Sequence, residues 1–135
     1  MKNHTEQLQI QTQGRSIIDL TRLIRDVVSR SAIQTGLVHV FIHHTSASLI
    51  VTENADPDVL TDLETYFSEL VPDGDDRYIH VAEGPDDMAS HVRSALTMTS
   101  TAAPIHEGRI NLGTWQAIYL WEHRHAPHRR RLTVT

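Results

Sequence analysis

The spacing of apolar and polar residues predicts a chain in which strands and three helices follow one another irregularly. The first run, residues 7–12, alternates polar and apolar positions, which is the period of a half-buried strand. Apolar residues three and four apart predict helices over residues 20–30, 57–70 and 85–98. Segments rich in β-branched and aromatic residues predict strands at 37–43, 47–52, 78–81, 101–106, 114–122 and 130–135.

This order does not show the strict strand–helix alternation of parallel α/β proteins. It therefore predicts an α+β fold, with mainly antiparallel sheets and about three helices. In the segment 114–122, alternate residues face opposite sides of a strand. Both tryptophans lie on one side, which is typical of a core strand or of a subunit interface, and Glu122 lies on the other.

Length and composition narrow the class of protein. A chain of 135 residues fits one domain, spanning 1–135, with 39% hydrophobic and 21% charged residues. The absence of cysteine excludes disulfides, a thiolate nucleophile and a Cys-type zinc site. The polar start lacks a signal-like apolar segment, and no stretch has the ~20 apolar residues of a membrane helix. We therefore expect a cytoplasmic protein with no membrane partner.

Charge is distributed unevenly along the chain. A formal net charge of −5 makes it a poor nucleic-acid binder, so no nucleic-acid partner is expected. Residues 124–131 nevertheless hold four arginines and two histidines, while residues 56–87 are rich in acids. The basic segment is either a solvated edge strand or an anion site. An anion site would suit a small phosphorylated metabolite, with Arg93, Arg124 and Arg130 as substrate-binding residues.

A first group of chemically active side chains follows the strand at 37–43. His43 and His44 are adjacent, so they point to opposite faces, and His44 at the strand end is favoured as a catalytic or metal-binding residue. Ser46 and Ser48 share a face and either bind phosphate or satisfy a turn. Glu53, a polar residue between an apolar strand and a helix, is a further catalytic candidate.

A second group combines histidines and acids from three kinds of element. His80 lies near the end of a predicted strand, Glu83 in a loop and His91 in a helix, one turn after Asp87. Imidazoles and carboxylates are ligands for a divalent ion, zinc or magnesium/manganese, with His44, His80 and His91 as metal ligands. Glu83 and Asp87 are then catalytic candidates. The alternative is that Asp87 and His91 form only a surface contact on one helical face.

The segments 44–49, 53–57, 83–88, 90–91 and 108–116 resemble, in order, the YjbQ-like family, whose members are described as secondary thiamine-phosphate synthases. The resemblance implies a compact α+β homotrimer with its site where subunits meet. It also implies a transferase that joins an aminopyrimidine pyrophosphate to a thiazole phosphate and releases pyrophosphate. The residues carried over by position are His44, Glu53, Asp56, His80, Glu83, His91 and Glu122.

One departure from the family pattern affects the chemistry. Arg93 stands where the family usually has lysine, and arginine stays charged, so this position has no catalytic amine. Three functions remain open from the sequence: the transferase, a metal-dependent phosphate-ester hydrolase, and a trimeric metabolite-binding protein without catalysis.

Overall fold

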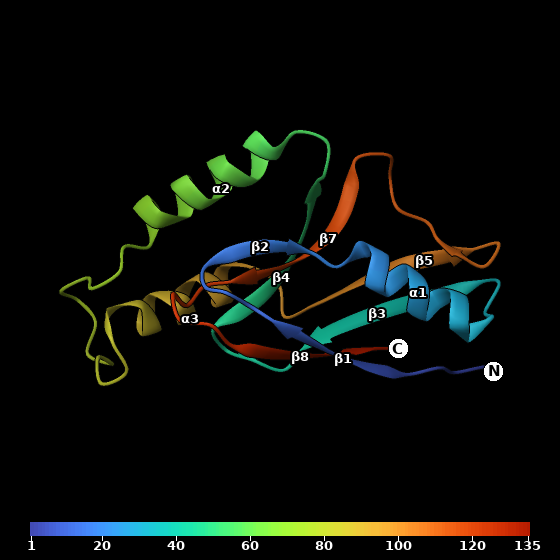
Figure 1. The fold of residues 1–135 in the computed structure, drawn as a ribbon, viewed down its shortest axis with the longest axis horizontal. Coiled ribbons are helices and arrows are strands. Elements are labelled where there is room, and N and C mark those ends of the chain that lie inside the picture. The colour runs from blue at the N-terminus through green and yellow to red at the C-terminus, as the bar shows by residue number, and fades with distance from the viewer.

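The computed structural model describes residues 1–135 and shows two antiparallel sheets with three helices, which confirms the α+β prediction (Figure 1). The larger sheet has the order β1 (Glu6–Gln11), β8 (Arg129–Val134), β3 (Gly36–Ile42), β5 (Ser100–His106), β6 (Arg109–Ile110). The smaller has the order β2 (Ser16–Asp19), β7 (Gln116–Glu122), β4 (Ala47–Glu53). The helices are α1 (Thr21–Ser31), α2 (Pro57–Leu70) and α3 (Pro85–Leu96).

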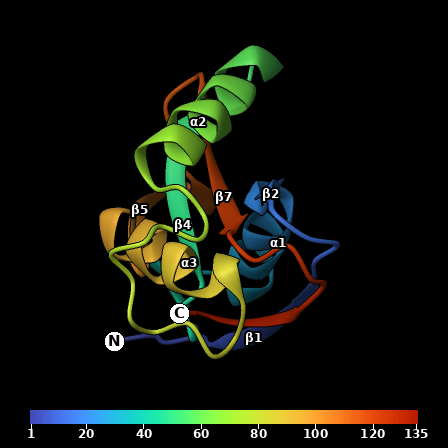
Figure 2. The ribbon, with the colours of Figure 1, turned by 90° about the vertical axis from the view of Figure 1, so that its left-hand side faces the viewer.

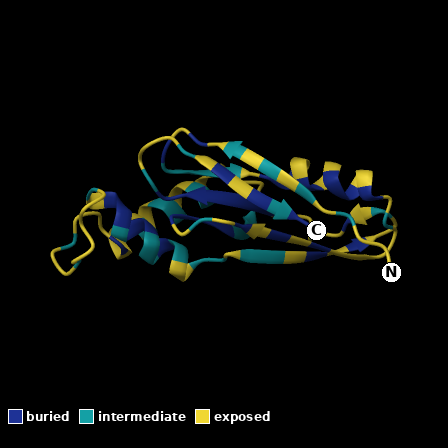
Figure 3. Ribbon diagram, turned by 90° about the horizontal axis from the view of Figure 1, so that it is seen from below, coloured by how far each residue is buried: buried dark blue, intermediate teal, exposed yellow.

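The core is built from both sheets and one side of α1. Ile24, Val27 and Val28 of α1 are buried against apolar residues of β3, β4, β5, β7 and β8. Strand β7 is buried on both faces from Ala117 to Glu122, because the smaller sheet is covered on both sides along this strand. Figure 3 shows buried segments running along the middle of the molecule, with exposed residues on the outer side of α1 and in the loop before α3.

The structure has two short strands that the sequence does not predict, β2 and β6, and lacks one that it does predict. Residues 16–19 form β2, paired with β7 with Ile17 opposite Trp121, although only four residues make the strand and the sequence pattern is too short to show it. The strand predicted at 78–81 is wrong, because this segment is irregular and finds no partner strand. Its apolar residues are therefore left in solvent, with Ile79 96% and Val81 63% exposed.

Helix α2 begins as predicted but hardly enters the core. Asp56 caps it, its Oδ1 accepting the Asp58 N–H at 2.9 Å, and Pro57 occupies the first helical position. No residue of α2 is buried, and Tyr66 and Leu70 are 66% and 54% exposed. Figure 2 shows α2 standing away from the rest of the molecule. Within the chain, Phe67 and Glu64 of α2 contact Trp121, whereas Tyr66 and Leu70 are left uncovered. A helix of 14 residues is only marginally stable without packing, so the exposed side is expected to need a further partner.

The buried side of α3 is mostly polar, whereas the apolar spacing that predicts this helix, with Met88, Val92, Ala95 and Leu96 on one side, favours an apolar inward face. Leu96 is exposed, whereas the buried residues are Asp86, Asp87, Ala89, Ser90 and Arg93. Burying charged groups is costly unless they are paired, so α3 must be held by specific ion pairs and hydrogen bonds. None of the three helices is long and apolar enough to span a lipid bilayer.

Candidate metal centre

Two histidines and one aspartate come together at the end of the molecule formed by α3 (Figure 1). His80 lies in the loop before α3, and Asp87 and His91 lie on α3. One ligand atom of each side chain lies within 4.8 Å of the others. Zinc binds such nitrogens and oxygens at ~2.0–2.2 Å, so modest side-chain rotations would bring all three atoms onto one ion. The structure thus joins His80 and His91, two of the three predicted metal ligands.

The start of α3 explains why these side chains converge. Gly84 has φ +103°, a left-handed conformation that favours glycine, and Pro85 then begins the helix. Asp87 therefore falls in the first turn, where the helix dipole favours a negative charge. His91 lies one turn later on the same helical face, which places its ring beside Asp87.

The hydrogen bonds around this group leave one carboxylate oxygen facing two imidazole nitrogens. Asp87 Oδ2 is 2.8 Å from His80 Nε2 and 3.2 Å from His91 Nε2. His91 Nδ1 lies 2.9 Å from the Thr45 carbonyl oxygen, which only accepts, so Nδ1 must carry the proton. Nε2 of His91 then turns a lone pair toward Asp87 when the ring is neutral, and donates to Asp87 when the ring is protonated. Such an arrangement needs either extra protons or a cation between the three side chains.

Arg124 holds Asp87 in place through the carboxylate oxygen that does not face the two histidines. Its Nη1 donates to Asp87 Oδ1 at 2.8 Å, its Nε to Asp86 Oδ2 at 3.1 Å and its Nη2 to the Glu83 carbonyl at 3.0 Å. Burial favours a raised pKa for Asp87, but the charge of His91, the hydrogen bond with His80, and Arg124 together lower it below its usual value. Asp87 is therefore a carboxylate, the form that binds metal.

A buried ion pair lies beneath the end of β7. Glu122 is fully buried, and Arg130 on β8 donates to both of its carboxylate oxygens. Thr12 donates to Glu122 Oε1 at 2.7 Å, and Arg130 also donates to the Ser46 hydroxyl at 3.0 Å. These bonds tie β1, β4, β7 and β8 together directly behind Arg124, whose own N–H donates to Glu122 Oε2 at 3.2 Å.

A second buried network surrounds His123 and Arg93, both fully buried. Arg93 donates through Nε to His123 Nδ1 at 3.0 Å and through Nη2 to Glu64 Oε1 at 2.7 Å. Because Arg93 has only donors, His123 Nδ1 must accept, and the proton lies on Nε2, 2.8 Å from the Ser48 hydroxyl. This network anchors the buried polar side of α3 to β4 and β7. His123 went unnoticed in the sequence because its neighbours there are polar and basic.

Burial of neutral His123 makes stability depend on pH. Burial first, and the nearby arginines second, lower the pKa of His123 from its usual 6.5 to about 2. As the pH falls, the unfolded chain therefore takes up this proton before the folded protein does. The contribution of His123 to the free energy of unfolding is fully present above pH 6.5 and decreases as the pH falls below 6.5. Between pH 6.5 and 4, this group alone should remove about 1 kcal/mol of unfolding free energy per pH unit. Urea unfolding at several pH values measures the slope, which His123→Asn should reduce.

The other predicted site residues lie elsewhere or are already engaged. His44 Nε2 accepts the backbone N–H of Arg131 at 2.7 Å and is outside the His80–Asp87–His91 group. Glu53 ends β4, six residues beyond Ala47, which corresponds to ~20 Å along a strand from the end nearest Thr45. Catalytic roles for His44 and Glu53 stay predictions.

The predicted substrate-binding residues already form ion pairs or hydrogen bonds with other residues of the chain. The guanidinium groups of Arg93, Arg124 and Arg130 each pair with carboxylates. The Ser46 hydroxyl accepts from Arg130, while the Ser48 hydroxyl contacts His123 and accepts from Thr97. In the structure these contacts hold the site in place, and a role of these residues in substrate binding stays a prediction.

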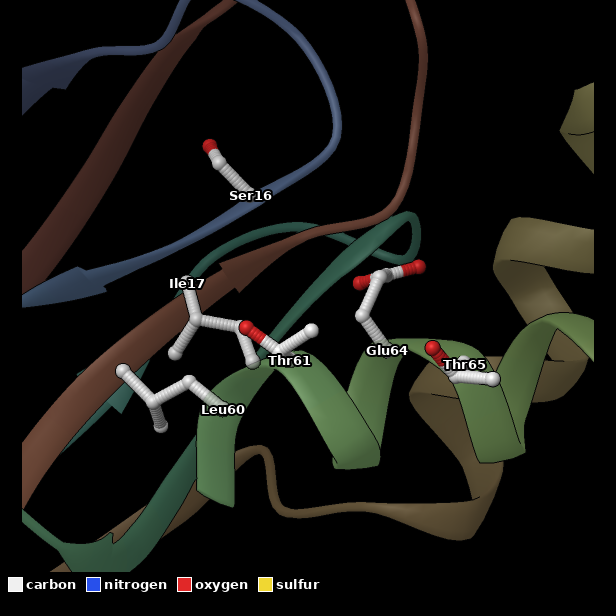
Figure 4. Close-up of a pocket in the computed structure, with 6 residues that line it drawn as sticks. All are labelled: Ser16, Ile17, Leu60, Thr61, Glu64 and Thr65. Atoms are coloured by element: carbon white, nitrogen blue, oxygen red, sulfur yellow. The ribbon is translucent and has the colours of Figure 1, made fainter. Parts of the chain in front are cut away.

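Two hollows lie near these networks. One, of about 370 Å³, adjoins the metal group and is lined by Gly74, Asp75, Asp76, Tyr78, His80, Val81, Gly84, Pro85 and Met88. The other, of about 340 Å³, lies between α2 and β2 (Figure 4). Its single carboxylate, Glu64, is already engaged by Arg93 and by Trp121 Nε1. Of these two hollows, the one beside His80 therefore combines space with the three side chains of the metal group.

Comparison with known proteins agrees with this fold. The sequence is 55% identical over 133 residues to the UPF0047 protein sll1880 of Synechocystis, covering 98% of this chain and 90% of the relative. It is 43% identical over 113 residues to the UPF0047 protein YjbQ of Escherichia coli O157:H7, covering 84% and 81%. The crystal structure of a conserved yjbq/upf0047 protein from Clostridium acetobutylicum matches with a TM-score of 0.89 at 32% identity, covering 96% and 98%.

The sequence profile of the UPF0047 protein YjbQ-like family matches residues 6–135, almost the whole chain. The relatives' names specify no activity. The profile, the relatives and the fold agree, and the chain belongs to the YjbQ/UPF0047 family.

Proposed function

We propose that this chain is a divalent-metal-dependent hydrolase of small phosphate esters, with the ion held by His80, Asp87 and His91. The observation that carries the proposal is the single Asp87 oxygen facing two imidazole nitrogens, 2.8 and 3.2 Å away. Two imidazoles and one carboxylate favour zinc or manganese over magnesium, which prefers oxygen ligands. A divalent ion bound here would polarise a phosphoryl oxygen and lower the pKa of water.

The chain's own residues supply positioning and proton transfer. Arg124 orients Asp87, and the Thr45 carbonyl orients His91. Glu83, in the loop that leads into α3, is the carboxyl group that we assign to accept a proton from the attacking water. The hollow of about 370 Å³ beside His80 gives room for the remainder of a small substrate.

Metal content and activity together test this proposal. Protein purified without a histidine tag should bind about one zinc or manganese ion per chain. Hydrolysis of p-nitrophenyl phosphate should vanish after chelation and return on addition of either ion. Protein that binds well below one ion per chain under saturating conditions would contradict the metal centre. A full metal site without turnover of any phosphate ester would favour the non-catalytic binding role.

The transferase reaction implied by the family resemblance is the second candidate. A divalent ion beside an open hollow also suits it, because pyrophosphate needs positive charge as it departs. The two reactions differ in their products. The transferase would release pyrophosphate only when both the aminopyrimidine pyrophosphate and the thiazole phosphate are present, whereas the hydrolase needs one substrate and water.

We also propose that the chain assembles as a homotrimer, with copies covering the open face of α2. Tyr66, Leu70 and Trp115 are more than half exposed, and none of α2 is buried. Such apolar side chains are typical of a surface that another subunit covers. A neighbouring copy is also the means by which Glu53 would approach the metal group. Light scattering should give three times the mass of one chain, and a monomer would contradict the proposal.

A further inference from the structure

A hollow lined by two arginines lies far from the metal group, on the other end of the molecule. Its volume is about 410 Å³, and it is lined by Arg25 and Ser29 of α1 and by Arg109 and Ile110 of β6. We call these four residues the arginine hollow. Figure 1 shows α1 and the turn after β5 at the end opposite α3. The proposed metal chemistry uses none of these residues.

The local backbone structure determines the positions of Arg25 and Arg109. Arg25 and Ser29 are four residues apart and share one face of α1. Arg109 follows a tight turn in which Glu107 and Gly108 have φ +49° and +75°, and the Gly108 N–H donates to the Gln34 carbonyl at 3.0 Å. Ile110 then enters the core, so its neighbour Arg109 is turned outward. A side chain at Gly108 would come within 3.1 Å of the Gln34 side chain.

These two arginines differ from most others in having no acidic partner. Six arginines of the chain form ion pairs with carboxylates: Arg15, Arg30, Arg77, Arg93, Arg124 and Arg130. Arg25 and Arg109 make no ion pair or side-chain hydrogen bond, although the chain carries a net charge of −5. No carboxylate lines the hollow. Asp26 lies next to Arg25 along α1 but outside the hollow, and Glu107 faces His106 at 3.8 Å.

We propose that the arginine hollow binds the phosphate group of a small phosphorylated molecule, at a second site independent of the metal centre. Guanidinium groups are planar forks that bind phosphate oxygens in pairs, and one phosphate has enough oxygens for two forks and a hydroxyl. A carboxylate has two oxygens, fewer than the three terminal oxygens and the double charge that a phosphate monoester offers to two guanidinium groups. The hollow is wide and has one apolar residue, Ile110, so it suits a hydrated anion better than an apolar ligand.

Titration of the whole protein with inorganic phosphate, in excess chelator, tests the site without any metal contribution. Amide NMR shifts should move at residues 25, 29, 109 and 110, and glycerol phosphate should produce the same pattern if the terminal phosphate is what is recognised. Arg25→Gln and Arg109→Gln should each weaken binding about tenfold or more, because each removes charge-assisted hydrogen bonds. Arg22→Gln is the matched control, since Arg22 is an exposed arginine of the same helix outside the hollow.

The outcomes distinguish a specific phosphate-binding site from nonspecific electrostatic attraction. Unchanged affinity in Arg22→Gln, with loss in the two hollow variants, supports the proposal. Equal weakening by all three substitutions would show only diffuse attraction and would overturn it, as would shifts confined to the metal end. Inorganic phosphate binding without glycerol phosphate binding would overturn the assignment to a phosphorylated molecule. None of these outcomes depends on whether the metal centre is active.

Discussion

Replacing Glu122 with alanine is expected to lower the free energy of unfolding by about 3–5 kcal/mol. Glu122 is fully buried, and its carboxylate receives hydrogen bonds from Arg130 and Thr12. Its removal leaves the Arg130 guanidinium, 3% exposed, in a dry environment with the Ser46 oxygens as its remaining partners. An unpaired buried charge is far more costly than the pair itself is stabilising. Urea unfolding of both proteins measures the difference.

Two further variants show whether the loss comes from the unpaired charge. The double variant Glu122→Leu with Arg130→Met removes both charges and should recover much of the stability. Arg77→Ala breaks an ion pair with Asp75 in which Arg77 is 84% exposed, so it should cost no more than about 1 kcal/mol. If Glu122→Ala cost as little as Arg77→Ala, the buried pair would not be what joins β7 and β8.

Neither the burial of Glu122 nor its partner is predicted by the sequence. The alternation along the strand places Glu122 on the side opposite the tryptophans, whereas the structure buries both sides of β7. Its partner, Arg130, lies on β8 in the other sheet, and only the folded arrangement of the two sheets brings it next to the end of β7. Period-2 patterns give the direction of a side chain, whereas contacts between strands far apart in the chain depend on topology.

For the metal group, too, the sequence predicts some of the structure and not the rest. The i,i+4 spacing predicts that Asp87 and His91 share a helical face, and the structure confirms this contact. His80 also joins the group, although the strand predicted for 78–81 is wrong. Apolar residues such as Ile79 and Val81 suggested a buried strand, yet within one chain they are exposed. A sequence pattern does not distinguish burial in the core from burial by another copy.

The polar side of α3 explains why its apolar pattern was misleading. The helix has to present Asp87 and His91 to one site while Arg93 reaches Glu64 and His123. Residues that serve these contacts occupy the inward face, which leaves Leu96 outside. Departures from simple amphipathic patterning are expected where a helix carries functional groups. The departure at α3 therefore agrees with the position of the candidate metal group at this end of the molecule.

Replacing His91 with alanine should weaken zinc binding by more than about 100-fold, because loss of even an outer partner of a ligand typically costs 10–100-fold. The effect is direct, since His91 Nε2 faces Asp87 Oδ2 and Nδ1 is fixed by the Thr45 carbonyl. Competition with a fluorescent chelator measures the affinity. Circular dichroism should show an unchanged fold, because the His91 side chain is 29% exposed and outside the main core.

Two histidine controls make the result specific to the site. His39→Ala should leave zinc affinity unchanged, because His39 is exposed on β3 and stacks only on Phe41. His44→Ala tests the predicted third imidazole. Weaker zinc binding in that variant would support His44 as a further residue of the site, acting on the ion or through its neighbour Thr45, whose carbonyl contacts His91. Unchanged zinc affinity in His91→Ala would contradict the metal centre, because no other set of three His or acidic side chains in the chain converges in this way.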